Sequence, residues 1–341
     1  MPCRISGDEP STSVARCAIS ASSSGYVVPS PHPTCSGIAV PSSRSPSGWY
    51  PDRASWIYLM SESPLPTSVV YPGSAGSYTS EAAERLYPTI EATSAGSFAD
   101  VFTAVRDGSA EVGVLPIENT LAGIVADTCN LIADGTLPIV AETIIHIPHC
   151  LAGLPGATTA GVSRIHSHPV ALAQCRVFLD RGFEEIGAPT TADAARIVAE
   201  QGDPKWAAIA SPAAAQRYGL EILESDISDH LENMTRFVAI AKTPLAYTEG
   251  VAWKTALRLV TGHQPGALHD AIEPLRYHKV NMVSLHSRPI PGEPWRYQFL
   301  IDIEGHQDDP AIIRALDDVR SRSAVLVCLG SFPAAEHPDA P

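Results

Sequence analysis

The sequence lacks a long apolar run and is short of positive charge. No stretch approaches the roughly 18 consecutive apolar residues of a membrane-spanning helix, so we expect a soluble, cytoplasmic protein without membrane association. Lysine and arginine number 23 against 37 aspartates and glutamates, which gives a formal net charge of -14. Because such a surface repels phosphate backbones, we expect no nucleic-acid partner.

The chain also lacks paired cysteines. Its seven cysteines lie singly, with no CxxC pair and no neighbouring histidine at the spacing of a zinc site. We therefore expect neither a disulfide framework nor a metal site. Cys129, Cys150 and Cys175 are interpreted as small buried apolar side chains in a reducing cytoplasm.

The first 59 residues differ in composition from the rest. They contain 14 serines, 8 prolines and no lysine, without sustained helical or strand periodicity. Such a segment buries too little apolar surface to offset its ordering entropy, so we expect a disordered head over 1–66. Its serine and arginine content fits a transit peptide, but Asp8, Glu9 and Asp52 argue against one. We favour a translated upstream region, with Met60 as the true start.

Between about residues 67 and 245, short β-branched runs alternate with amphipathic stretches. This pattern is typical of an α/β fold around a parallel or mixed sheet. The expected strands lie at 67–71, 89–93, 111–117, 138–147, 164–167, 206–210 and 236–241. The expected helices begin near Glu81, Phe98, Val125, Pro169, Ala192 and Pro212.

After a short linker the pattern changes to strand, helix, strand, strand, helix, strand. These elements are expected at 254–262, 265–278, 279–288, 295–305, 309–321 and 324–330. The order predicts a separate ferredoxin-like βαββαβ domain over 252–333, followed by a tail at 334–341.

Small polar residues gather just past several expected strands, where open α/β sheets bind ligands. They occur at 73–80, 117–120, 167–169, 190–193 and 233–237. Gly73 and Gly76 let the backbone approach a ligand, and the helix that follows presents free N–H groups to a carboxylate. The expected ligand is a small anion, although a turn with positive φ accounts for the two glycines equally well.

Each polar cluster also has a purely structural interpretation. Glu118 and Asn119 fit a polar strand end with a helix N-cap, and Ser167 fits an N-cap. Gln174 lies two turns along the helix that follows Ser167, where it needs a partner if buried. A strand-end arginine such as Arg236 is as a rule a solvated charge. No single motif decides between structure and function.

Taken together, residues 69–241 resemble the prephenate dehydratase family. The resemblance rests on GSAGSYTSEAA (73–83), GVLPIENTLAG (113–123), IPHCLAG (147–153), SHPVALAQCRVFL (167–179), TTADAA (190–195) and NMTRF (233–237). Residues 254–333 resemble the regulatory ACT domain of that enzyme, through PGALHDAI (265–272) and LHSRP (285–289). The combination of TRF, IEN and SHP at these separations is highly specific, whereas each alone is common.

The resemblance implies two α/β lobes, similar to those of a periplasmic binding protein, with a cleft between them. We expect the first lobe at about 67–146 and 225–245 and the second at about 147–224. The implied activity is that of a monofunctional enzyme of phenylalanine biosynthesis, which converts prephenate to phenylpyruvate without a cofactor or metal.

The same resemblance assigns residues to the cleft. Thr235 and Glu118 are expected to be catalytic. The expected substrate-binding residues are Ser77, Tyr78, Asn119, Thr120, Ser167, Gln174, Thr190 and Arg236. The Thr235 hydroxyl would donate to the departing hydroxyl, unless Glu118, the only carboxylic acid among them, is the proton donor. Arg236 or helix-terminal N–H groups would hold a carboxylate, and the amides with Ser167 would orient the ring.

Resemblance to the ACT domain implies feedback inhibition by L-phenylalanine. The implied effector-binding residues are Gly266, Ala267, Leu268, His286, Ser287, Arg288 and Pro289. On local sequence alone, the first of these segments is a plain helix start after Pro265. The family usually has glutamate where this chain has His286, so phenylalanine affinity or its pH dependence is expected to differ. Such sensing sites generally form where two domains pair, which implies a homodimer or homotetramer.

Two other functions stay open at this point. Arogenate dehydratase performs the same elimination on the amino analogue of prephenate and yields phenylalanine directly. A non-catalytic sensor of small carboxylates is the second, since lobed α/β clefts and ACT domains both occur in sensors. The presence of Thr235, Glu118 and Asn119 argues against the sensor.

Overall fold

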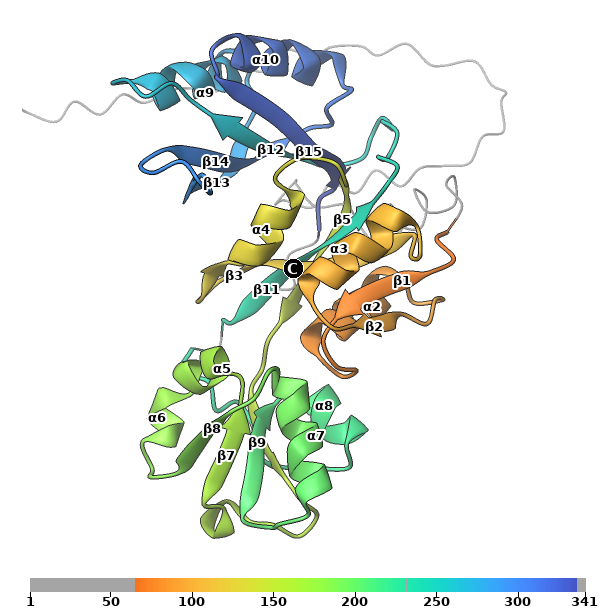
Figure 1. Ribbon diagram of the computed structural model, residues 1–341, viewed down its shortest axis with the longest axis vertical. Coiled ribbons are helices and arrows are strands. Elements are labelled where there is room, and N and C mark those ends of the chain that lie inside the picture. Colours follow the sequence, from red (N-terminus) through yellow and green to blue (C-terminus); the bar gives the residue numbers. More distant parts are fainter. Residues whose placement is uncertain (1–64, 231, 336–341) are drawn as a thin grey trace, which may run out of the picture. The chain divides into compact units, whose positions relative to one another are not determined.

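The computed structural model describes residues 65–230 and 232–335. The expectations for the head over 1–64, including Met60 as the true start, and for the tail over 336–341 lie outside the described residues. The described residues form three β-sheets with their covering helices (Figure 1). None of the helices in these two stretches is long and apolar enough to cross a membrane.

The first sheet is mixed and takes one strand from much later in the chain. Its strands lie in the order β2 (Thr93–Ala95), β1 (Val69–Pro72), β3 (Val112–Asn119), β11 (Met234–Ala241) and β5 (Ile139–His146), and β4 (Gly123–Ile124) pairs with β3. β1 is parallel to its neighbours, whereas β11 is antiparallel to both β3 and β5. Side chains alternate between the two faces of the strands, and two separate apolar clusters form.

Three helices accompany this sheet, namely α2 (Tyr78–Leu86), α3 (Phe98–Asp107) and α4 (Ala126–Ile132). The first two begin at serine caps, because the hydroxyls of Ser77 and Ser97 each accept a hydrogen bond from a backbone N–H of the first turn. Ser77 places the start of α2 earlier than the expected position near Glu81. α3 ends at Gly108 in the left-handed conformation that terminates many helices.

The second sheet is formed by the middle of the chain. Its strands lie in the order β10 (Glu221–Glu224), β6 (Cys150–Gly153), β9 (Trp206–Ala210), β7 (Arg164–Ser167) and β8 (Glu184–Gly187). The accompanying helices are α5 (Pro169–Gln174), α6 (Arg176–Leu179), α7 (Thr191–Gln201) and α8 (Pro212–Arg217), with a short 3-10 helix η1 (Thr159–Gly161). The chain enters this sheet through 147–149 and leaves it after β10 to return to the first sheet at β11, so the predicted α/β fold with two lobes and two crossings is confirmed.

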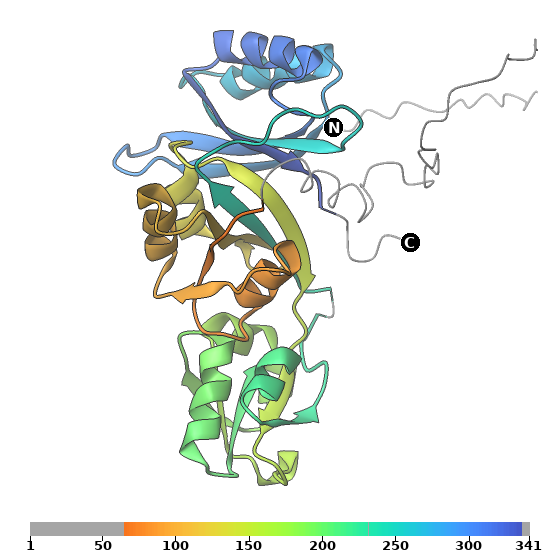
Figure 2. The ribbon, with the colours of Figure 1, turned by 90° about the vertical axis from the view of Figure 1, so that its right-hand side faces the viewer.

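The third sheet has the predicted βαββαβ order, which is also confirmed. Its strands lie in the order β13 (Met282–Pro289), β14 (Tyr297–Glu304), β12 (Trp253–Val260) and β15 (Val325–Pro333). Its helices are α9 (Ala267–Tyr277) and α10 (Pro310–Ser321), which lie together on one face of the sheet in both views (Figures 1 and 2). An apolar cluster that includes Leu257, Ile301 and Leu316 fills the space between sheet and helices.

Five strands differ from the sequence expectation. β2 occupies Thr93–Ala95 rather than 89–93, and β4, β6, β8 and β10 were not expected. β6 is a short, buried inner strand, whereas β2, β8 and β10 are edge strands with largely exposed or half-exposed side chains. Edge strands bury little, so their sequences lack the apolar alternation by which strands are recognised.

Candidate active site

Thr235 and Asn119 face each other across two neighbouring strands of the first sheet. Thr235 lies near the start of β11, Asn119 ends β3, and the two residues are paired in register. Nδ2 of Asn119 lies 2.9 Å from Oγ1 of Thr235. The structure therefore brings together two of the residues that the sequence predicted for the cleft.

Backbone groups orient the Asn119 amide. Its Oδ1 accepts hydrogen bonds from the N–H groups of Leu121 and Ala122, at 3.0 and 2.8 Å, and its Nδ2 donates to the Met234 carbonyl at 3.0 Å. Oxygen and nitrogen cannot be exchanged without losing all three bonds. Asn119 is thus the donor to Thr235, with its two Nδ2 hydrogens shared among Thr235, Met234 and Asn233, and the Thr235 hydroxyl hydrogen has no acceptor among the described residues. That hydrogen is free to be donated to a ligand.

Further side chains extend this pair toward the second lobe. Asn119 Nδ2 lies 2.7 Å from Asn233 Oδ1, and Asn233 Nδ2 donates to Gln174 Oε1 at 3.1 Å. Nε2 of His149 lies 2.9 Å from the same Gln174 oxygen. We call Thr235, Asn119, Asn233, Gln174 and His149 the polar chain. Gln174 ends α5 in the second lobe, so the polar chain joins the two lobes.

The glycine-rich loop at 73–77 makes a second connection between the lobes. The Ser74 hydroxyl donates to Asp193 at 2.6 Å, and the Tyr218 hydroxyl donates to the Ala75 carbonyl at 3.0 Å. Gly76 has a φ of 85°, and a Cβ at this position would lie 3.3 Å from the Cα of Ala214 in α8. Positive φ and close packing therefore account for this glycine without a ligand.

Two predicted substrate-binding residues of this region are helix caps, and a third contacts the polar chain. The hydroxyls of Ser77 and Thr190 each accept a bond from the N–H three residues later. Tyr78, the first residue of α2, donates its hydroxyl to the Pro148 carbonyl, and its ring lies 6.3 Å from the His149 ring. Tyr78 therefore places the N-terminus of α2 beside the polar chain.

Ser167 and Thr120 have structural partners of their own. Ser167 is fully buried and donates to the Ile209 carbonyl of β9 at 2.7 Å. Thr120 is exposed, and its hydroxyl donates to the Glu232 carbonyl at 3.0 Å. Within the described part of the chain, neither hydroxyl bonds to a side chain of the polar chain. Both hydroxyls thus hold neighbouring backbone in place through bonds to its carbonyl groups.

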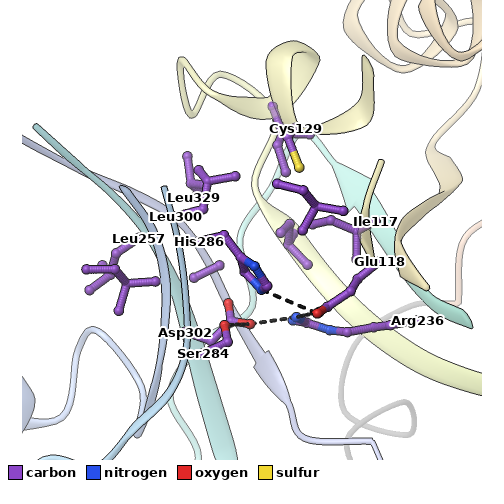
Figure 3. Close-up of a pocket in the computed structure, with 15 residues that line it drawn as sticks. Ile117, Glu118, Cys129, Arg236, Leu257, Ser284, His286, Leu300, Asp302 and Leu329 are labelled. Atoms are coloured by element: carbon purple, nitrogen blue, oxygen red, sulfur yellow. Dashed lines mark hydrogen bonds and ion pairs between the residues drawn. The ribbon is translucent and has the colours of Figure 1, made fainter. Parts of the chain in front are cut away.

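Glu118 and Arg236 were expected in the same cleft as Thr235. The structure corrects this expectation, because it places both side chains away from Thr235. Neighbours along a strand point to opposite faces, so Asn119 and Thr235 share one face and Glu118 and Arg236 the other. Glu118 lies 3.3 Å from Nε2 of His286 and 3.9 Å from Nη1 of Arg236. Figure 3 shows these three side chains converging.

Arg236 is enclosed by carboxylates. Its Nε lies 2.6 Å from Glu142, and its Nη1 lies 2.6 Å from Asp302. The Glu142 side chain, 1% exposed, also lies 2.9 Å from Nζ of Lys254 and accepts the Ala335 N–H. We call Glu118, Glu142, Arg236, Lys254, His286 and Asp302 the interface cluster, because they connect the first sheet with the third.

Opposite charges control the protonation of the interface cluster. Burial by itself would raise the pKa of Glu142, but the positive charges of Arg236 and Lys254 outweigh burial and lower that pKa. The pKa of Asp302 is lowered in the same way, against the effect of burial. The two carboxylates raise the pKa of Arg236, although burial opposes them. Arg236 is therefore charged, and its charge is already paired within the protein.

A cavity of about 30 Å³ lies beside the interface cluster. Its lining includes Glu118, Arg236 and His286, together with apolar side chains such as Leu300 (Figure 3). Roughly one or two water molecules fill such a space, so the cavity is far too small for prephenate. Within the described ranges, no group of three or more histidine, cysteine, aspartate or glutamate side chains is arranged to hold a metal ion.

The predicted effector residues occupy two segments at one end of the third sheet. Gly266, Ala267 and Leu268 form the start of α9, and Gly266 has a φ of 81°. The segment 286–289 lies on β13, which is an edge strand. The register pairs Val260 with Gln298 and Gln298 with Arg288, so β14 separates the two segments.

Three residues with central contacts were not predicted from the sequence. They are His149, Asn233 and Glu142, all nearly or fully buried. A buried polar side chain needs a partner, and His149 and Glu142 each stand in a largely apolar stretch, which is a signal that could have found them. Asn233 belongs to the polar cluster at 233–237, so its place in that motif was the available signal.

Comparisons with known proteins agree with the motifs. The model of the family described as prephenate dehydratase matches residues 69–245. The Komagataeibacter europaeus bifunctional N-acyl-homoserine lactone acylase/prephenate dehydratase is 38% identical over 268 residues, or 78% of this chain and 95% of the relative. The Escherichia coli K12 bifunctional chorismate mutase/prephenate dehydratase is 32% identical over 283 residues, or 81% and 73%. A solved prephenate dehydratase from Arthrobacter aurescens in complex with L-Phe has 28% identity and a TM-score of 0.71, covering 80% of this chain and 94% of that one.

Proposed function

The chain belongs to the prephenate dehydratase family, and on that premise we propose that Thr235 is the catalytic residue of its dehydration of prephenate to phenylpyruvate. The observation that carries the proposal is the hydrogen bond from the backbone-oriented Asn119 amide to Thr235 Oγ1. This bond leaves the hydroxyl hydrogen for the substrate. A hydroxyl that accepts a hydrogen bond is also a stronger donor, since linked hydrogen bonds polarise one another.

The reaction requires little beyond a placed donor. Prephenate takes up a proton and loses carbon dioxide and water, and the aromatic ring of phenylpyruvate is formed. The electron pair of the breaking carbon–carboxylate bond moves into the ring as the hydroxyl on the opposite carbon departs. Thr235 donates a hydrogen bond to that departing hydroxyl, where negative charge develops in the transition state.

A carboxylate of the substrate needs a partner other than Arg236, whose charge is paired in the interface cluster. The N-terminus of α2 is the group we propose. Tyr78 at its first position contacts His149 of the polar chain, and Ser77 caps the helix. The free N–H groups of a first helical turn and the helix dipole both favour an anion.

A direct assay separates this function from the two alternatives. The full-length chain is incubated with prephenate and with arogenate, and phenylpyruvate and phenylalanine are measured separately. We expect faster conversion of prephenate. A higher kcat/KM with arogenate would identify an arogenate dehydratase, and no product from either substrate would identify a sensor.

Phenylalanine is the effector that we propose for the third sheet, which we interpret as an ACT domain. The βαββαβ order supports this assignment, as does the relative from Arthrobacter aurescens solved with L-Phe. The two effector segments lie at one end of the sheet, and the edge strand β13 exposes Val283 and Leu285. A homodimer or homotetramer formed through this edge would bring in a second copy. The cytoplasmic location stays a prediction.

The interface cluster supplies the route by which we propose that the effector acts. His286 belongs to the effector segment and contacts Glu118, the neighbour of Asn119. Asp302 contacts Arg236, the neighbour of Thr235. Strands β3 and β11 therefore have the donor pair on one face and the effector domain on the other. A shift of the third sheet on binding phenylalanine would move both strands.

Replacing Glu118 by glutamine tests this route and also the alternative proton donor. We expect kcat to stay within about threefold of the parent, because Glu118 faces away from Thr235, and inhibition by phenylalanine to weaken by about fivefold or more. Rates of prephenate conversion at increasing phenylalanine concentration measure both kcat and the strength of inhibition. Glu111→Gln is a matched control, since Glu111 directly precedes β3 and bonds to Thr67. A collapse of kcat would make Glu118 the proton donor, and unchanged inhibition would remove this contact from regulation.

A further inference from the structure

His149 is a buried histidine that no step of the proposed mechanism uses. It lies in the crossing at 147–149 and is 2% exposed. Its carbonyl accepts the Ile227 N–H at 3.0 Å, and the N–H of Ile147 donates to the Asn233 carbonyl at 2.7 Å. Residues of the two crossings between the lobes therefore meet at His149 and hold its backbone.

The hydrogen-bond pattern determines which ring nitrogen of His149 carries the hydrogen. Asn119 donates to Asn233, so Asn233 presents its oxygen to Asn119 and its nitrogen to Gln174. Gln174 in turn presents its oxygen to both Asn233 and His149. Because a carboxamide oxygen only accepts hydrogen bonds, Nε2 of His149 must be a donor.

The other ring nitrogen indicates the neutral form. Nδ1 of His149 is buried and has no hydrogen-bond partner among the described residues. A second proton would leave an N–H without an acceptor there and would bury a positive charge. Burial lowers the pKa of His149, and its bond to Gln174 opposes this only in part. His149 is thus a neutral ring that donates from Nε2.

We propose that His149 is a positioning residue for the dehydration, acting by holding the Gln174 carboxamide in one orientation. In that orientation Gln174 Nε2 lies 3.5 Å from Asn119 Oδ1 and donates toward it. Without the His149 donor only the bond from Asn233 holds the Gln174 oxygen, so the amide turns over more easily, and its oxygen would then face the oxygen of Asn119. The disturbance reaches Thr235 through Asn119, so the inference rests on the proposed role of Thr235.

Two substitutions of His149 in the full-length chain provide the test. A glutamine side chain reaches the position of imidazole Nε2 and can donate there, whereas an asparagine side chain reaches only the position of Nδ1. We expect His149→Asn to lower kcat for prephenate by about tenfold or more, with a smaller change in KM, because a small misplacement of a reacting group is costly. We expect His149→Gln to recover kcat to within about threefold of the parent.

The matched control is His166→Gln. His166 is 4% exposed, lies in β7 and stacks on Trp206, and we expect its variant to keep the parental kcat. Thermal unfolding of each variant gives the folded fraction to which kcat is referred. The proposal is overturned if His149→Asn keeps the parental kcat, or if His149→Gln is no better than His149→Asn at equal folded fraction. Parental activity in a Thr235→Ala variant would instead overturn the mechanism itself.

Discussion

Replacing Thr235 by alanine is expected to lower kcat for prephenate by about 10²-fold or more, with little change in KM. The reason is that its hydroxyl gains most of its interaction energy in the transition state, when the departing oxygen becomes negative. Asn119 then loses an acceptor but keeps its backbone bonds, so the site itself is expected to stay formed. Steady-state kinetics of phenylpyruvate formation measure the effect.

Two further variants sharpen the test of Thr235. Thr235→Ser keeps the O–H group and is expected to preserve much of the rate. Thr235→Val keeps the shape of the side chain without the hydroxyl, and is expected to be as impaired as the alanine variant. If the valine variant kept a rate close to the parent, the hydroxyl would play no part in the reaction.

Replacing Glu142 by glutamine is expected to destabilise the fold by about 3–5 kcal/mol, because it leaves Arg236 and Lys254 buried beside a neutral group. Glu142 lies in β5, 1% exposed, and it bonds to both cations and to the Ala335 N–H. Urea unfolding of parent and variant at neutral pH measures the loss. Glu185→Gln removes a surface partner of Arg176 and is the control, with little expected change in the unfolding midpoint. Equal stabilities of parent and Glu142 variant would show that the interface cluster does not hold the fold together.

The same cluster predicts how stability depends on pH. The pKa values of Glu142 and Asp302 are lowered in the folded protein, with burial overcome by Arg236 and Lys254. A group with a lowered folded pKa stabilises the fold above its unfolded pKa, about 4 for these carboxyls. That contribution is lost as the pH falls through the folded value. Parent stability should therefore decline in this acid range, and the Glu142 variant should decline less.

Local sequence was sufficient for much of the fold. Most strands with continuous apolar runs, and the helix starts near Phe98, Pro169 and Pro212, were predicted close to their observed positions. The polar ends of strands were harder to predict. β3 continues to Asn119 and β11 begins at Met234, beyond the apolar runs expected at 111–117 and 236–241. The motif residues therefore lie inside strands, where successive side chains face opposite sides.

That alternation explains why Glu118 and Arg236 do not share a face with Asn119 and Thr235. Glu118 and Asn119 are adjacent in the chain, as are Thr235 and Arg236, and the sequence placed all four in one cleft. Only the pairing of β3 with β11, in register, shows which of them share a face. The other face lies against the third sheet, whose His286 and Asp302 contact Glu118 and Arg236.

The sequence by itself determined the alternation of strands and helices and the family to which the motifs belong, because each depends on residues near one another in the chain. Tertiary structure alone decided the partners of the polar side chains. The Asn119 amide meets Thr235 across 116 positions, and Ala335 meets Glu142 across 193. Such bonds depend on strand register and on the packing of separate sheets, which are set by the whole fold and have no local pattern to reveal them.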